Sequence, residues 1–483
     1  MSWRHLFHVV GAVVAATGVA MLVPVTVSLV YQEWSVAGWT LAAAVITFLF
    51  GLLMWMVFDR PGELSTKEGF ATVGLAWIAI AAFGSLPYLL TGAIPDITNA
   101  FFETAAGFTT TGASVVPDPS ILPHGILFWR SMTQWMGGMG VIVLSIAILP
   151  LMGLGAVQLA RAESPGPMPD RLTPRFRETA KRLWFVYLAL TAVEVLFLVV
   201  GDMSLFESVN HAFTTMSTGG FSTNPGSLSA FSTYTQWVVI VFMVLAGASF
   251  ALHYRALKTP GVYWKSTEFR VYMAILAVAA VIMTLGTWGG LAGLTIIRDA
   301  VFTSVSIVTT TGYATADYAL WAPALQILIV GLMFVGGMAG STAGAIKTYR
   351  LEVLYEASRM DLRRLIHPSG VFVTRIGRSI VPDPVVEAVQ TFFLLYMFAF
   401  MTGTALLGFI GLVANVDLSI ATTVSAVASS LGNIGPGLDQ VGPTQNYLVI
   451  PVLGKWLLAF TMIVGRLEIL PVLLLFTREL WRR

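Results

Sequence analysis

Ten long apolar segments constrain the fold of this 483-residue chain more than any other feature. A helix needs roughly 20 apolar residues to cross a bilayer. The segments are Val9–Tyr31, Gly38–Phe58, Gly69–Leu90, Ile126–Leu151, Trp184–Val200, Trp237–Leu252, Val271–Leu291, Ala322–Ala345, Val385–Val413 and Tyr447–Phe476. Charged residues make up 11% of the chain, against about 25% in soluble domains. The sequence therefore predicts an all-α polytopic membrane protein, and the absence of cysteine excludes disulfides and Cys-based metal sites.

Four short segments rich in Thr, Ser, Gly or Asn lie between these apolar runs, and we number them as filters 1 to 4. They are Thr109–Ser114, Ser217–Ser222, Thr309–Ala314 and Leu431–Gly437. A bare cation needs oxygen atoms in place of its hydration shell, and rings of backbone carbonyls can supply them. Glycine lets neighbouring carbonyls turn toward one axis, because it adopts conformations closed to other residues. Four such segments in one chain are the number that closes a four-fold ring.

Short amphipathic helices are predicted before the filters, most clearly at Asp96–Phe108 and Ser204–Met216. They are too short to span a bilayer, and Ser204 with Glu207 fits a capping box that starts a helix. The repeating unit is helix, pore helix, filter and helix, four times around one pore with pseudo-four-fold symmetry. The predicted parts are an N-terminal helix pair at 1–66 and pore repeats at 67–160, 161–262, 263–378 and 379–483.

The positions of Lys and Arg predict the orientation in the membrane. Most of these 27 residues lie at the two termini or in four links that carry no filter. Positive charge marks the cytoplasmic side, so both termini are expected inside and the filters are expected to open outward. Among the basic links, the proline-rich Arg161–Arg182 is predicted to be irregular, and Lys347–Arg378 to be a helical extension with a surface loop.

The four filters, together with Gly336–Gly344 and Gly465-Arg466-Leu467-Glu468, resemble the Trk/Ktr/HKT superfamily of potassium transporters, most closely its TrkH branch. The resemblance implies potassium uptake across the bacterial inner membrane by a transporter, not an enzyme, with no cofactor. In that superfamily, Gly at all four filter positions goes with potassium selectivity. A sodium-coupled or sodium-permeating member is the alternative. The resemblance leaves open whether the flux is channel-like or a symport.

The predicted ion-binding residues are the filter glycine of each repeat and the two residues before it. They are Thr110, Thr111, Gly112, Thr218, Gly219, Gly220, Thr310, Thr311, Gly312, Asn433, Ile434 and Gly435. Their side chains differ between repeats, so we expect an ion to be held mostly by backbone carbonyls.

A glycine-rich stretch, Gly336–Gly344, interrupts an apolar run, and irregular backbone at membrane depth is tolerated only where protein or a cavity surrounds it. The resemblance implies an intramembrane gate beneath the filters, with Arg466 facing the pore. Close helix packing by small residues is the alternative. Ala343 and Ala345 stand where the family pattern has glycine. The predicted gate residues are Gly336, Gly337, Gly340, Ser341, Thr342, Gly344, Lys347 and Arg466.

Several other charged or polar residues have two interpretations. Arg466 and Glu468 are two apart and lie on different helix faces, so Glu468 is expected to pair with another basic residue. Glu103, Glu207 and Asp299 either attract cations at the outer mouth or satisfy local backbone donors. The six histidines show no metal-ligand spacing and are expected to be structural.

The resemblance also implies partners: a second copy of the chain and a cytosolic TrkA-type nucleotide-binding ring that moves the gate. We expect the ring to dock on Lys347–Arg378, chiefly at Arg359, Arg363 and Arg364, and Arg161 to matter less. The alternative is that these basic links only fix topology. No nucleotide-binding loop is predicted in the chain itself, because two residues separate Gly344 from Lys347, and no nucleic-acid partner is expected. A membrane enzyme and a purely structural subunit are both disfavoured.

Overall fold

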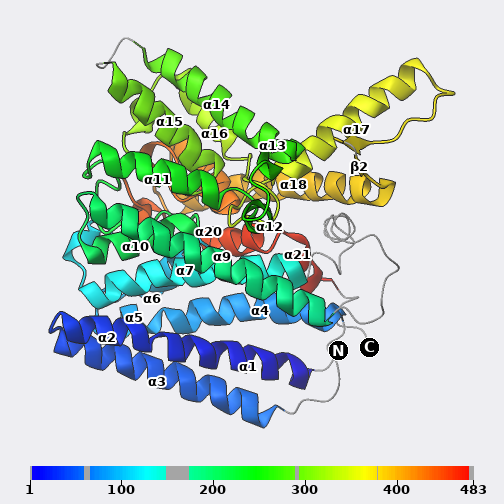
Figure 1. The fold of residues 1–483 in the computed structure, drawn as a ribbon. Helices are drawn as coiled ribbons and strands as arrows, with labels where there is room; N and C mark the ends of the chain where they lie inside the picture. The colour runs from blue at the N-terminus through cyan, green and yellow to red at the C-terminus, as the bar shows by residue number, and fades with distance from the viewer. Residues whose placement is uncertain (1–2, 59–65, 148–172, 289–292, 378, 478–483) are drawn as a thin grey trace.

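The computed structural model describes residues 3–58, 66–147, 173–288, 293–377 and 379–477, and it is almost wholly helical (Figure 1). At the N-terminus, α1 (Trp3–Ala20) and α2 (Leu22–Val30) run against α3 (Trp34–Val57). Lipid gives no hydrophobic force between helices, so close approach depends on small residues. A Cβ at Gly11, Gly18 or Gly51 would lie closer than 3.0 Å to backbone of the facing helix. Glycine at these positions therefore allows α1 and α3 to pack as a tight pair.

Four repeats follow, each with a short helix before its filter. The first contains α4 (Thr66–Gly84), α5 (Leu86–Thr91), α6 (Ile97–Phe108), η1 (Pro119–Ile121) and α7 (His124–Ala147). The second contains α9 (Thr173–Val200), α10 (Leu205–Met216), α11 (Thr233–Ala246), α12 (Phe250–Ala256) and α13 (Val262–Lys265).

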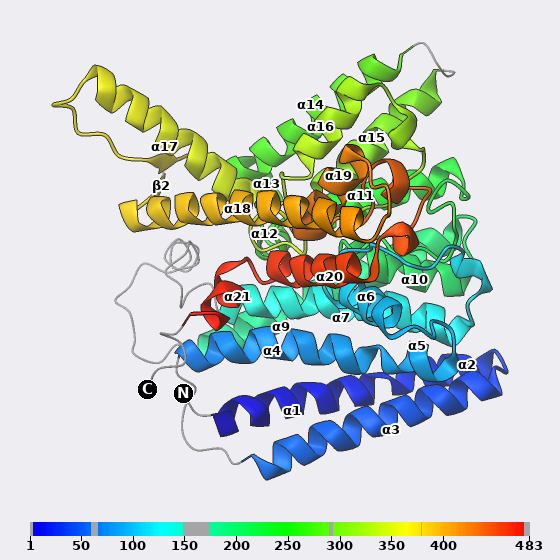
Figure 2. The ribbon, with the colours of Figure 1, turned by 180° about the vertical axis from the view of Figure 1, so that it is seen from behind.

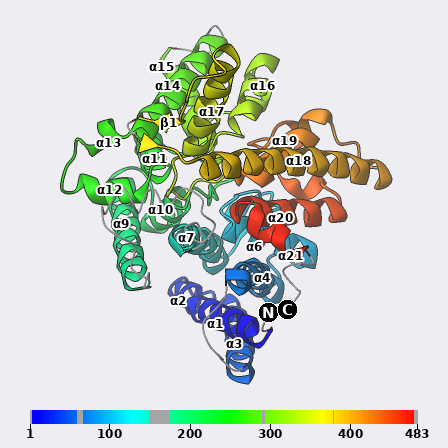
Figure 3. The same ribbon diagram turned by 90° about the vertical axis from the view of Figure 1, so that its right-hand side faces the viewer.

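The third repeat contains α14 (Thr267–Thr287), α15 (Leu294–Val308), η2 (Tyr318–Leu320), α16 (Pro323–Leu332), α17 (Thr348–Ile366), β1 (Arg375–Ile376) and β2 (Ser379–Ile380). The fourth contains α18 (Asp383–Val413), α19 (Ile420–Gly432), η3 (Asp439–Val441), η4 (Tyr447–Val449), α20 (Val452–Arg466) and α21 (Leu470–Leu475). Seen end-on, the repeats lie around a common centre and the α1–α3 unit lies outside them (Figure 3).

The pore helices begin where the sequence predicts. Asp96 caps α6 by accepting a hydrogen bond from Asn99 N at 2.8 Å. Ser204 and Glu207 form the predicted capping box of α10, in which Glu207 Oε2 accepts from Ser204 N at 2.9 Å. Such N-caps stabilise a helix by about 1 kcal/mol each. They hold the start of each short helix, so its C-terminal end is fixed beside the filter.

Two spans that were predicted to be continuous are broken in the structure, and a third, Ala322–Ala345, breaks near its predicted interruption. The segment Trp237–Leu252 is the pair α11 and α12, bent by 100°. The segment Ala322–Ala345 is helical only in α16 and continues as irregular backbone. Tyr447–Phe476 is interrupted after α20, where Glu468 and Ile469 have φ of 58° and 62°. Among the described residues, six helices meet the length and hydropathy of a single span, or seven with the bent pair.

Of the two basic links for which the sequence predicts a structure, one agrees with the prediction and the other does not. The helical extension predicted in Lys347–Arg378 is α17, which projects from the helix bundle (Figure 2). The chain returns from it through the small antiparallel pair β1–β2, which the sequence did not indicate. The prediction of an irregular Arg161–Arg182 was wrong from Thr173 onward, where α9 begins with Pro174 in its first turn. Residues 161–172 lie outside the described part of the chain.

Candidate ion-conducting pore

The four filters share one backbone conformation. Two residues before the filter glycine the backbone is left-handed, with φ of 52° at Thr110, 54° at Thr218, 57° at Thr310 and 55° at Asn433. The glycines themselves have φ of 78° at Gly112, 76° at Gly220, 79° at Gly312 and 112° at Gly435. Left-handed backbone is uncommon for residues other than glycine. Its recurrence at equivalent positions shows that the four segments are structural repeats, and such alternation turns neighbouring carbonyls toward one side.

The filter glycines close the segments into a ring. A Cβ on Gly112 would lie closer than 3.0 Å to Gly219 O, one on Gly220 to Thr311 O, and one on Gly312 to Ile434 O. The circle closes at Gly435, where a Cβ would lie 2.7 Å from Thr111 O. Each glycine therefore contacts the carbonyl that precedes the filter glycine of the next repeat. Only residues without a side chain fit this arrangement.

Filters 1 and 3 are braced by their own hydroxyl groups. The Oγ1 atoms of Thr109 and Thr111 lie 2.7 Å apart, and those of Thr309 and Thr311 lie 2.8 Å apart. In both filters the first Thr also donates to a carbonyl of its pore helix, at 2.6 Å and 2.7 Å. Hydroxyl groups of the TTTG strings thus tie these two filters to the ends of α6 and α15.

Filters 2 and 4 are braced differently. Gln134 of α7 donates from Nε2 to Gly219 O at 2.7 Å and accepts from Phe221 N at 3.1 Å. In filter 4, Asn433 Nδ2 donates to Thr111 Oγ1 at 3.0 Å and to Met462 O at 2.9 Å. Both amides connect a filter to another element, so these two strands depend on their neighbours.

The carbonyl of Gly435 departs from the predicted ion-binding pattern. It accepts hydrogen bonds from Ser429 Oγ and from Tyr447 OH, each at 2.7 Å. A carbonyl oxygen has two lone pairs, and both are used here. In filter 3 the equivalent serine, Ser306, instead donates to Tyr313 O, one residue after the filter glycine, at 2.6 Å. The hydrogen bond from this serine therefore reaches a carbonyl one residue earlier in filter 4 than in filter 3, although the two filter glycines keep equivalent places in the ring.

Each pore helix ends beside its filter. The helices α6, α10, α15 and α19 end at Phe108, Met216, Val308 and Gly432. The C-terminal end of a helix carries partial negative charge from its unpaired carbonyls. Four such ends directed at one ring favour a cation at its centre and disfavour an anion.

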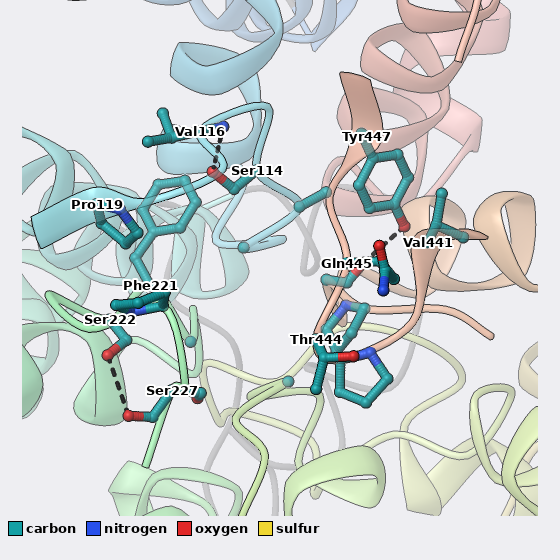
Figure 4. Close-up of a pocket in the computed structure, with 18 of the residues that line it drawn as sticks. Ser114, Val116, Pro119, Phe221, Ser222, Ser227, Val441, Thr444, Gln445 and Tyr447 are labelled. Atoms are coloured by element: carbon teal, nitrogen blue, oxygen red, sulfur yellow. Dashed lines mark hydrogen bonds between the residues drawn. The ribbon is translucent and has the colours of Figure 1, made fainter. Parts of the chain in front are cut away.

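Hydrogen bonds join the segments that follow the filters into a closed ring around one mouth of the pore. Arg130 donates to Ser222 O at 3.1 Å, Leu228 N to Ala314 O at 3.0 Å, Thr444 Oγ1 to Asp317 at 2.9 Å and Tyr447 N to Ser114 O at 2.9 Å. These bonds link repeat 1 to 2, 2 to 3, 3 to 4 and 4 to 1. The pocket they surround is lined by residues from all four repeats (Figure 4).

The acidic residues near this mouth accept hydrogen bonds from local donors. Glu103 is buried and accepts from Arg130 at 2.7 Å, from Ser114 Oγ and from Val115 N. Glu207 belongs to the capping box of α10, and Asp299 accepts from Thr315 Oγ1 at 2.9 Å. Of the two interpretations from sequence, the geometry favours the structural one. Within the described residues no three His, Asp or Glu side chains are placed to hold a metal ion.

The predicted gate segment is irregular and lies against filter 3 and the end of the second pore helix. Gly344 N donates to Thr310 Oγ1 at 2.7 Å. Thr342 Oγ1 donates to Met216 O, at the end of the second pore helix, at 3.0 Å. Gly340 and Ala345 have φ of 76° and 51°. The segment is therefore a folded loop held under filters 2 and 3, and the helix-packing alternative does not describe it.

Two buried cations hold this loop. Arg466 is 3% exposed and donates from Nη1 to Thr342 O at 2.7 Å. Its Nε and Nη2 atoms have no hydrogen-bond partner in the described part of the chain. Lys347 Nζ donates to the carbonyls of Ser341 and Ala343 within the loop. Positive charge thus lies beneath the ring, where it opposes an entering cation.

Glu468 forms an ion pair with Arg350 of α17. The sequence predicted that its partner would be a basic residue other than Arg466. The Arg350 guanidinium also lies 4.0 Å from the centre of the Phe392 ring. Arg466 and Glu468 follow one another closely in the chain but bind different partners. The Arg350–Glu468 ion pair connects the start of α17 to the segment that follows α20.

Sequence reasoning missed Arg130 and Gln134, although both lie in a predicted apolar span. Residues four apart share a helix face, and a buried polar face requires partners. That signal indicates a contact but not which segment supplies it. The structure identifies the partners as filters 1 and 2.

A ring of carbonyl-bearing strands at the ends of four re-entrant helices defines a cation pore of the four-repeat type. Residues 39–482 match the TrkH family model, described as a cation transport protein, and the chain belongs to this family. It is 36% identical over 491 residues to the Trk system potassium uptake protein TrkH of Escherichia coli K12, and 38% over 495 residues to TrkH of Vibrio parahaemolyticus. Both alignments cover 100% of each chain. The crystal structure of the potassium transporter TrkH from Vibrio parahaemolyticus superposes with a TM-score of 0.91 over 100% of both chains, at 34% identity. The chain is a transporter, not an enzyme.

Proposed function

We propose that the chain carries potassium across the bacterial inner membrane through the ring formed by filters 1 to 4. The observation that carries the proposal is the circular contact of Gly112, Gly220, Gly312 and Gly435 with the carbonyls of the following repeats. Rings of carbonyls that replace a hydration shell are the means by which proteins select potassium. The relatives that match over the whole chain are named potassium uptake proteins, which agrees with this chemistry.

Uptake of rubidium, a potassium surrogate, by proteoliposomes containing the purified protein tests this function. We expect rubidium uptake to be suppressed by an excess of potassium and not by the same concentration of sodium. Suppression by sodium to the same extent would favour the sodium-permeating alternative. No uptake above that of empty vesicles, after removal of the gate segment, would contradict transport by this chain.

The gate in this proposal is the loop Gly336–Gly344 with Arg466 and Lys347. The loop lies under filters 2 and 3, and its hydrogen bonds to Thr310 and Met216 hold it there. Deleting part of the loop, or replacing Arg466 with Ala, is expected to raise the unregulated flux. The matched control is Arg298→Ala, which removes an arginine paired with Asp299 outside the loop. Unchanged flux in both gate variants, with normal expression, would contradict the gate.

A cytosolic nucleotide-binding ring of the TrkA type is the proposed regulator, acting on a homodimer of this chain. The helix α17 starts at Thr348, directly after Lys347, and projects from the bundle at the end where both termini lie (Figure 1). Both termini are proposed to be cytoplasmic. Arg359 and Arg364 are half exposed and form ion pairs with Glu356 and Asp361 of the same helix, and Arg364 also donates to Phe372 O at 3.3 Å. A pull on α17 would reach the loop without crossing the membrane.

Charge reversal of Arg359, Arg363 and Arg364 together tests this surface. We expect weaker capture of the ring and loss of the flux response to nucleotide. Reversal of Lys258 and Lys265, exposed in a different basic segment, is the control. Retained binding and a normal nucleotide response in the triple variant would show that α17 is not the docking surface.

A further inference from the structure

Gln134 makes an unusual contact for a side chain outside the filters. It is fully buried on α7, and its amide forms hydrogen bonds to filter 2 on both sides of Gly220. The nitrogen donates to Gly219 O at 2.7 Å, and the oxygen accepts from Phe221 N at 3.1 Å. One side chain of repeat 1 therefore spans the filter glycine of repeat 2.

The side chain also explains why filter 2 has glycine where filters 1 and 3 have threonine. Gly219 corresponds to Thr111 and Thr311, but its φ is not left-handed, so the backbone alone would accept another residue. A Cβ at Gly219 would lie closer than 3.0 Å to the Gln134 amide. The glutamine thus occupies the space of the missing threonine side chain.

Repeat 4 shows that this brace is not a general feature of the fold. A Cβ on Gly137 would collide with Phe108 O, and one on Gly465 with Leu431 O. Each of these carbonyls lies four residues before the filter glycine of its own repeat, so Gly137 and Gly465 are equivalent. Three residues earlier, the counterpart of Gln134 is Met462, whose side chain carries no amide.

We propose that Gln134 determines the ion selectivity of the pore by fixing the separation between Gly219 O and Phe221 N. Two consecutive glycines, Gly219 and Gly220, make filter 2 the most flexible of the four strands. Without the amide the strand relaxes, and the ring no longer keeps the size that separates potassium from sodium. The inference rests on the proposed potassium transport and names a specificity-determining residue for it.

The test replaces Gln134 with Met, the residue of repeat 4, and measures the reversal potential under opposed potassium and sodium gradients. We expect the permeability ratio to fall about tenfold, which corresponds to the net loss of one to two buried hydrogen bonds. The matched control is Gln236→Met, in which an equally buried glutamine loses bonds to Leu228 O and Phe231 O, outside the filters. Its ratio is expected to match that of the unmodified protein.

A rescue variant distinguishes loss of the Gln134 hydrogen bonds from a general loss of structure. Gln134→Ala combined with Gly219→Thr empties the space that the glutamine amide fills and provides a hydroxyl that can pair with Ser217, as Thr111 pairs with Thr109 in filter 1. We expect the double variant to recover selectivity, including the case in which Gln134→Met alone does not fold. An unchanged ratio in a folded Gln134→Met variant would overturn the inference, as would failure of a folded double variant to recover. Absence of rubidium uptake by the protein without its gate segment would instead contradict the proposed function.

Discussion

Filters 1 and 3 are braced by hydroxyl pairs within each strand, whereas filters 2 and 4 are braced by amide side chains that bond between repeats. In the first pair, hydroxyl contacts 2.7 and 2.8 Å long join the two threonines of the strand. In the second pair, Gln134 and Asn433 make amide bonds that cross between repeats. The ring therefore alternates self-braced and externally braced strands. Four-fold backbone symmetry does not require four-fold chemical symmetry, and the differences indicate where the ring can be weakened selectively.

The largest expected effect distinguishes the filter glycines, whose backbone is left-handed, from Gly219, whose backbone is not. Gly312→Ala places a Cβ against Ile434 O in a left-handed backbone, which costs about 1–3 kcal/mol in strain before the clash is counted. We expect rubidium uptake to fall strongly and the remaining flux to discriminate less between potassium and sodium. Gly219→Ala meets only the Gln134 side chain, which can move, so uptake should persist with reduced selectivity. Equal uptake by the two variants would remove the distinction.

A second comparison concerns the threonines two residues before the filter glycines. Thr310 Oγ1 accepts from Gly344 N of the loop, whereas Thr110 Oγ1 has no hydrogen-bond partner in the described structure. Thr310→Val should destabilise the closed loop by about 1 kcal/mol and raise the unregulated leak about fivefold. Thr110→Val should leave the leak unchanged. A similar leak in both variants would show that the Thr310 bond does not hold the loop.

The hydroxyl pair of Thr109 and Thr111 in filter 1 is expected to contribute less to ion selectivity than Gln134 does. Thr109→Val removes the hydroxyl pair with Thr111, while Thr111 Oγ1 keeps its bond from Asn433 at 3.0 Å. The loss is about 1 kcal/mol of stability, with potassium selectivity reduced less than in Gln134→Met. Melting temperature and reversal potential measured on the same preparation check both parts. A larger loss of selectivity than in Gln134→Met would reverse the proposed order of importance.

The smallest effect is expected at Ala345, which has a φ of 51° in the loop. Ala345→Gly removes the strain of a left-handed alanine, and we expect a gain in stability of less than about 1 kcal/mol. A lower melting temperature in Ala345→Gly would contradict the strain argument.

The pore helices, the filters and the break after α16 could be predicted from sequence because their signals are local. Ser204 and Glu207 mark a helix start, and consecutive glycines mark backbone that no long helix retains. The bend between α11 and α12 lacked such a signal, since Gly247 and Ser249 stand in an otherwise apolar run. The partners of Gln134 and Arg130 also lay beyond the sequence, because a buried polar residue indicates that a partner exists and only the tertiary fold supplies it.

We propose that the four filters form a single potassium-selective ring. The most direct test is the reversal potential of vesicles containing the unmodified protein and the Gly112→Ser variant, under opposed potassium and sodium gradients. Because a Cβ on Gly112 meets Gly219 O of the next repeat, we predict that the potential follows potassium in the unmodified protein and shifts toward sodium in the variant. The same potassium-following potential in both proteins would contradict the claim.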